Sequence, residues 1–230
     1  MYSSQIMESI VISIGGSVLF SGEVESDFFK KLNLLLQNVS KNYKVYLVVG
    51  GGKKARKLIK EGRQKGLSEE ELDKIGIGVT RENAKSLVDW LDNSNITIPK
   101  STDEAKGMSE KIIVMGGTTP GHSTDMVGAE LAEKTYASKF IIATNVDGVY
   151  DKDPNKFSDA KKYDEISIDE LIEQLGTDWK TAGKNTVIDG PALAIIHKAR
   201  IPTFILNGKS LDELEKALFN KEFTGTKIKV

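Results

Sequence analysis

Three consecutive glycines followed by basic side chains are the part of this sequence best suited to bind a phosphate group. Residues 50–52 are all glycine, and they separate the apolar residues 46–49 from Lys53, Lys54 and Arg56. Because glycine lacks a Cβ atom, the backbone here can lie directly against a ligand, toward which the N–H groups of a following helix would point. The same pattern is also compatible with a tight turn between a strand and a helix that binds nothing.

Two more glycine-rich turns follow apolar segments, and they favour the binding interpretation. Residues 15–17 (Gly-Gly-Ser) come after residues 10–14, and residues 116–125, which begin Gly-Gly-Thr and end Ser-Thr-Asp, come after residues 112–115. In open α/β sheets, ligands bind beyond the carboxyl ends of the strands. The three turns are therefore expected to converge on one crevice that holds a nucleotide tail and a second phosphorylated or carboxylated substrate.

Several familiar chemistries have no signature in this sequence. It lacks the Gly-x-x-x-x-Gly-Lys-Ser/Thr loop, a Gly-x-Gly-x-x-Gly fingerprint after its first apolar segment, and the Gly-x-Ser-x-Gly elbow. His122 and His197 are its only histidines, and they form no metal-binding pattern. The remaining interpretation is phosphoryl transfer by positioning and charge neutralisation. His122 is interpreted as a loop residue rather than a base, because a phosphate acceptor is already ionised.

The elements that must position these turns alternate between strands and helices. Strands are expected over residues 10–14, 45–49, 95–98, 112–115, 140–143, 203–206 and 227–230. Helices are expected over residues 28–39, 53–61, 68–75, 80–92, 102–107, 126–136, 168–175, 191–198 and 211–219, with capping residues at Ser68, Thr102 and Ser167. This alternation predicts an α/β fold with a mainly parallel sheet.

Composition narrows the choice of ligands and cellular setting. The chain has 230 residues, a net charge of −1 and no cysteine, which excludes disulfides, thiolate metal sites and cysteine nucleophiles. The near-neutral charge gives no reason to expect nucleic acid or a membrane as partner, so local basic groups must meet any anionic ligand. No apolar run has the length of a membrane span, and the first residues lack the apolar core of a signal peptide. A cytoplasmic location is therefore expected.

Four motifs in a fixed order resemble the amino acid kinase superfamily and, within it, the uridylate kinases of the archaeal type. They are Ile-Gly-Gly-Ser at 14–17, Val-Gly-Gly-Gly at 49–52 with Arg56, the turn 116–125, and Thr-Asn-Val-Asp-Gly-Val-Tyr at 144–150 with Asp153. The resemblance implies a single domain over residues 1–230, folded as a three-layer α/β/α sandwich. It also implies transfer of the ATP γ-phosphoryl group to UMP with Mg²⁺, giving UDP and ADP in pyrimidine biosynthesis, by a homohexamer built as a trimer of dimers.

The resemblance also implies roles for individual residues. The UMP-binding residues would be Gly51, Gly52, Arg56, Asp73, Thr119, Thr124 and Asp125. The ATP-binding residues would be Thr144, Asn145, Asp147, Gly148, Tyr150 and Asp153, while Gly15, Gly16 and Ser17 would line the path of the phosphoryl group on the ATP side. Other interpretations stay open, because Asp73 also suits a position near a helix end and Asp125 suits a helix N-cap. Asp147 followed by Gly148 is by itself an ordinary turn.

Two positions depart from the superfamily pattern. Ser13 stands where most members have a lysine that neutralises the transferred phosphoryl group, and Ala194 stands where some relatives have a second lysine. The positive charge that neutralises the transferred phosphoryl group would then come from Mg²⁺ together with Lys184 or Lys53. Gly15, Gly16, Ser17 and Lys184 are accordingly the expected catalytic residues.

Two alternatives to a UMP kinase remain. The same fold could phosphorylate isopentenyl phosphate, carbamate or an N-acetylated amino acid, although Arg56 and Asp73 together favour a phosphorylated sugar. A non-catalytic binding protein is the second alternative, and Ser13 is its supporting feature.

Overall fold

A seven-stranded sheet forms the centre of the computed structural model, which describes residues 7–22, 26–178 and 187–230. The strands are β1 (Ser9–Ile14), β2 (Lys44–Val49), β3 (Ile112–Met115), β4 (Lys139–Thr144), β5 (Glu165–Ser167), β6 (Thr203–Asn207) and β7 (Thr226–Lys229). Their order is β3-β2-β1-β4-β6-β7-β5. Only β7 and β5 run opposite to the others, since β7 pairs antiparallel with β6 and parallel with β5. The predicted mainly parallel α/β sheet is confirmed.

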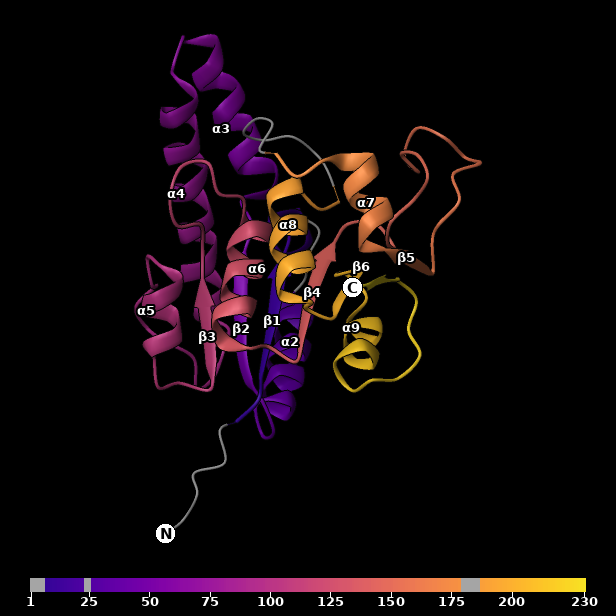
Figure 1. Ribbon diagram of the computed structural model, residues 1–230. Helices are drawn as coiled ribbons and strands as arrows, with labels where there is room; N and C mark the ends of the chain where they lie inside the picture. The colour runs from indigo at the N-terminus through magenta and orange to yellow at the C-terminus, as the bar shows by residue number, and fades with distance from the viewer. Residues whose placement is uncertain (1–6, 23–25, 179–186) are drawn as a thin grey trace.

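Helices cover both faces of this sheet (Figure 1). They are α1 (Gly16–Leu19), α2 (Ser26–Val39), α3 (Gly52–Gln64), α4 (Glu69–Val88), α5 (Thr102–Gly107), α6 (Thr124–Thr135), α7 (Ile168–Leu175), α8 (Gly190–Ala199) and α9 (Leu211–Leu218). Successive side chains of a strand point to opposite faces, so Ile10 and Ile12 pack with α2 and α9, whereas Val11 packs with α6 and α8. This produces three layers.

The register of the sheet brings the glycine turns to one edge. Ile14 at the end of β1 lies opposite Val49 of β2 and Ala143 of β4, and Met115 at the end of β3 lies opposite Val48. The turns that follow these strands therefore begin side by side. Within the described residues, no helix is both long and apolar enough to cross a membrane.

Helices α3 and α4 pack against each other and extend beyond the sheet (Figure 1). The sequence predicts two helices over 68–75 and 80–92, and this prediction is wrong, because α4 is continuous from Glu69 to Val88. Gly76 and Gly78 each disfavour a helix by about 1 kcal/mol. Burial of apolar side chains such as Leu72 and Leu87 along the helix offsets that cost. The capping box of Ser68 is confirmed.

The strand predicted over residues 95–98 is also absent from this segment, which makes only an isolated bridge from Ser94 to Ile112. The side chain of Asn95 takes the place of a strand at the edge of β3. Its Oδ1 accepts from Val114 N at 2.6 Å, and its Nδ2 donates to Val114 O at 2.9 Å. These bonds satisfy the backbone of a buried edge strand that would otherwise lack partners.

Smaller differences concern element ends. Ser101, rather than Thr102, caps α5, because its Oγ accepts from Glu104 N at 3.1 Å. The three-residue strand β5 and the four-residue helix α1 were not expected, since segments so short carry no recognisable periodicity.

Candidate active site

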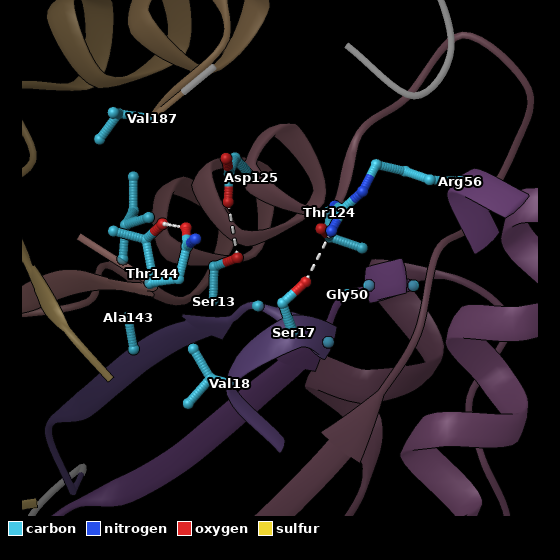
Figure 2. Close-up of a pocket in the computed structure, with 16 residues that line it drawn as sticks. Ser13, Ser17, Val18, Gly50, Arg56, Thr124, Asp125, Ala143, Thr144 and Val187 are labelled. Carbon is cyan, nitrogen blue, oxygen red and sulfur yellow. Dashed lines mark hydrogen bonds between the residues drawn. The ribbon is translucent and has the colours of Figure 1, made fainter. Parts of the chain in front are cut away.

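A pocket of about 160 Å³ lies at the carboxyl edge of β1, β2 and β4 (Figure 2). Most of the residues that the sequence predicts for the site line it, namely Gly15, Gly16, Ser17, Gly51, Gly52, Arg56, Thr124, Asp125, Thr144 and Asn145. Ser13, Val18, Gly50, Ile142, Ala143 and Val187 complete the lining. The fold thus gathers residues from five segments that are distant in the sequence around one cavity.

The first two glycine turns pack backbone against backbone. A Cβ atom on Gly16 would lie 2.3 Å from the carbonyl oxygen of Gly50. Gly52 has φ +64°, and a Cβ atom there would lie 2.6 Å from the carbonyl carbon of Gly16. Glycine is therefore required at both positions by the contact between the turns, independently of any ligand.

Helix α3 begins at this contact and presents its N-terminus to the pocket. Gly51, at the N-cap position, has no side chain with which to cap the first N–H groups of the helix. Arg56 lies one turn into the helix, and its Nη2 donates to Ser17 Oγ at 2.8 Å (Figure 2). Uncapped N–H groups beside an arginine form a site for an anion.

Among the described residues, Asp125 is the one acidic residue in the pocket lining, and it is bonded to Ser13. Ser13 Oγ donates to Asp125 Oδ1 at 2.7 Å (Figure 2). Burial, together with the nearby charge of Asp189, raises the pKa of Asp125 to about 7, and the Ser13 hydrogen bond opposes this rise. Asp125 therefore exchanges its proton near neutral pH, unlike an ordinary aspartate.

The N-termini of α6 and α8 are joined next to Asp125. Ser123 Oγ accepts from Met126 N at 2.9 Å and is the N-cap of α6, so the predicted N-cap role of Asp125 is wrong. Asp189 caps α8 by accepting from Ala192 N at 2.8 Å, and its other oxygen accepts a hydrogen bond from Ser123 Oγ. The capping position belongs to the residue with extended backbone just before the helix, which is Ser123.

Other predicted residues lie outside the pocket lining. Asp73 Oδ2 accepts from Gly121 N at 2.6 Å, and Thr119 is exposed on the same turn. Asp147 accepts from Asn207 Nδ2 at 3.0 Å, and Asp153 accepts from Asn155 N at 3.0 Å.

Only the first part of the motif at 144–150 borders the pocket. Thr144 and Asn145 border the pocket, whereas Gly148 packs against Thr226 of β7 and Tyr150 makes a bridge with Lys162. Lys184 lies outside the described residues.

Sequence reasoning missed the polar side chains of α4 that hold the glycine turns. Asn83 is buried, and its Nδ2 donates to the carbonyl oxygens of Gly50 at 2.9 Å and Gly51 at 3.3 Å. Thr80 Oγ1 accepts from Gly117 N at 2.7 Å. Polar residues three apart on the buried face of an otherwise apolar helix were the available signal.

Missed as well were Asp189 and the partnership of Ser13 with Asp125. Asp189 has the ordinary local signature of a helix N-cap, because Pro191 follows within the first turn, but its bond to Ser123 has none. The bond between Ser13 and Asp125 has no local signature either, because the two residues are 112 positions apart.

The parallel sheet, its glycine turns and the pocket between them define an α/β protein built to bind phosphorylated ligands. Comparison with known proteins makes this specific, because the profile of the amino acid kinase family matches residues 8–207. The chain belongs to the amino acid kinase family.

Individual proteins resemble the chain over nearly its whole length. A uridylate kinase of Methanobrevibacter smithii is 43% identical over 222 residues, which are 95% of this chain and 98% of that protein. A uridylate kinase of Thermoplasma acidophilum is 41% identical over 92% of both chains. The crystal structure of uridylate kinase from Archaeoglobus fulgidus matches with a TM-score of 0.84 and 40% identity, covering 96% of this chain and 99% of that one.

Proposed function

We propose that this chain is a UMP kinase that transfers the γ-phosphoryl group of ATP to UMP, releasing ADP and UDP for pyrimidine nucleotide biosynthesis. The observation that carries the proposal is the one pocket at which the turns after β1, β2 and β4 meet. Such a pocket suits the place where the phosphate groups of two substrates meet, and relatives about 40% identical are named uridylate kinases.

On the acceptor side, Gly51, Gly52 and Arg56 would hold the phosphate of UMP. The uncapped start of α3 supplies N–H donors, and the planar guanidinium of Arg56 adds a charged fork. Thr124 and Asp125 would lie along the nucleotide from the opposite wall, with Thr119 nearby. Asp73 would reach the ribose hydroxyls with the carboxylate oxygen other than the one bonded to Gly121.

On the donor side, Thr144 and Asn145 would contact ATP from the end of β4. Asp147, Gly148, Tyr150 and Asp153 would continue the same binding site beyond the lined pocket. Gly15, Gly16 and Ser17 lie between the two sides and would line the path of the transferred group.

Mg²⁺ is proposed as the ion that accompanies ATP. Mg²⁺ usually takes one or two protein carboxylates beside substrate phosphates and water. The pocket fits this requirement, because Asp125 places a carboxyl group in its lining, whereas no cluster of three or more potential ligands occurs among the described residues. The ion would neutralise phosphate charge when bound, with Asp125 as its protein ligand.

In this reaction the protein would position the two substrates and supply positive charge to the transferred phosphoryl group. A phosphate oxygen of UMP would attack the γ-phosphorus of ATP while the bond from that phosphorus to the β,γ-bridging oxygen breaks. No general base is needed, since the UMP phosphate is already ionised. Ser13 cannot supply the positive charge of the missing lysine and is bonded to Asp125 instead. Arg56 and Lys53, together with Lys184, are the proposed cationic groups.

An assay of ADP release by the full chain with ATP and Mg²⁺ tests the proposal, with UMP, CMP, dUMP and isopentenyl phosphate offered in parallel. Turnover is expected with UMP. Arg56→Met is expected to raise the KM for UMP by about tenfold or more, the value of a lost charge-assisted hydrogen bond. Lys57→Met, which alters the exposed neighbour on the same helix, is the matched control. Binding of UMP without turnover of any acceptor would favour the non-catalytic binder.

Three further properties are proposed on the strength of the family resemblance. They are a single domain over residues 1–230, a homohexamer built as a trimer of dimers, and a cytoplasmic location. Light scattering of the purified chain measures the oligomer directly, and a mass other than six chains would contradict the hexamer.

A further inference from the structure

Helix α4 holds the third glycine turn, residues 116–125, at two points. Near the start of the turn, Thr80 Oγ1 accepts from Gly117 N. Near its middle, Asp73 Oδ2 accepts from Gly121 N at 2.6 Å. The residues between these two bonds form an arch over α4, and the chain then continues to Thr124 and Asp125 in the pocket lining. The position of α4 therefore fixes the position of this wall.

Arg81 makes the most extensive of these connections. Its Nε donates to Gly117 O at 3.0 Å, and its Nη2 donates to Thr118 O at 2.9 Å. Nη2 also lies 3.4 Å from Lys100 O on the segment before α5. One guanidinium thus joins α4, the turn after β3 and the neighbouring loop. Arg81 itself is not among the residues that line the pocket.

Only arginine can make this set of contacts. Its guanidinium is planar and carries donors in a fixed fork, so two successive carbonyl groups can be held in one orientation. A lysine at position 81 would bring a single ammonium group on a flexible stem. The turn also lies directly against the backbone of α4, because a Cβ atom on Gly116 would lie 2.7 Å from Arg81 N.

We propose that Arg81 is a positioning residue for the phosphoryl acceptor, which it serves by fixing the carbonyl groups of Gly117 and Thr118 and thereby the arch that leads to Thr119 and Thr124. The inference rests on the proposed function, in which that arch contacts UMP. Arg81 makes none of its contacts with the donor-side residues Thr144 and Asn145. Its loss should therefore weaken the binding of UMP more than the binding of ATP.

The test measures UMP binding by calorimetry without ATP, and the KM values for UMP and ATP, in the full-length chain. Arg81→Met keeps most of the apolar stem and removes the donors. It is expected to weaken UMP binding by about tenfold or more, the effect of losing charged hydrogen bonds, while the KM for ATP changes by clearly less. Arg81→Lys is expected to lie between this variant and the wild type. Lys85→Met is the matched control, since Lys85 lies one turn further along α4 and contacts Ile96 O at 3.4 Å.

Three results would overturn the inference. In the first, Arg81→Met binds UMP as tightly as the wild type. In the second, UMP and ATP affinities fall together in Arg81→Met, or in Arg81→Lys if the methionine variant does not fold. In the third, Lys85→Met behaves like Arg81→Met. A wild-type chain that neither binds nor phosphorylates UMP would instead refute the proposed function, and with it this role, so the wild-type measurement separates the two failures.

Discussion

Replacing Asp125 by asparagine is expected to stabilise the folded protein at neutral pH and to have little effect in acid. Burial, followed by the charge of Asp189, raises the pKa of Asp125 from 3.8 to about 7. The unfolded chain releases this proton near its ordinary pKa, while the folded protein keeps it until about pH 7. Between the two values the folded state binds more protons, so the free energy of unfolding falls as pH rises.

The size of the effect follows from the shift. About three pKa units correspond to at most about 4 kcal/mol. Because the carboxyl group borders a water-accessible pocket, we expect about half of that, about 2 kcal/mol. Asparagine has no proton to lose, and its Oδ1 can still accept from Ser13 Oγ. The variant should therefore gain stability relative to the wild type progressively from about pH 4 to about pH 7, and gain it in full only above about pH 7.

Urea unfolding of the Asp125→Asn and wild-type proteins at about pH 3, below the ordinary pKa of aspartate, and at about pH 8 measures this difference. The variant should be more stable by about 2 kcal/mol at the higher pH and nearly equal at the lower one. Asp164→Asn is the control of opposite sign, because the hydrogen bond and charge of Lys162 lower the pKa of the exposed Asp164. Its stabilising contribution is present above its unfolded pKa, so the control variant loses stability at the higher pH. Equal gains for Asp125→Asn at both pH values would refute the reasoning.

Three further substitutions test the packing of the fold by thermal or urea unfolding. Gly52→Ala should cost more than about 1 kcal/mol, because φ is +64° and the new Cβ atom would meet the backbone of Gly16; a neutral result would disprove that contact. Asn95→Leu should cost about 1–3 kcal/mol, since Val114 N and O lose their buried partner, and an unchanged midpoint would count against it. Lys139→Met should cost a similar amount, about 1–3 kcal/mol, because the buried ammonium donates to the last carbonyl groups of α9; retained stability would show that water replaces it.

The strands that carry the site were predictable because their signal is local. Unbroken apolar segments such as β1 and β2 are typical of strands covered on both faces, and each ends at a glycine-rich turn. Helix α4 shows the limit of such reasoning. Two interior glycines indicated a break, yet packing against α3 and the sheet keeps the helix continuous, and that packing cannot be read from neighbouring residues.

The sequence by itself determined which backbone segments surround the pocket, since glycine positions and strand ends are properties of a few adjacent residues. Only the tertiary structure determined which side chains contact one another around the pocket. Ser13 meets Asp125 only because β1 and α6 pack together, and Arg81 reaches Thr118 only because α4 lies beneath the third turn. Such contacts join residues that are distant in the chain, and their geometry exists only once the helices have packed onto the sheet.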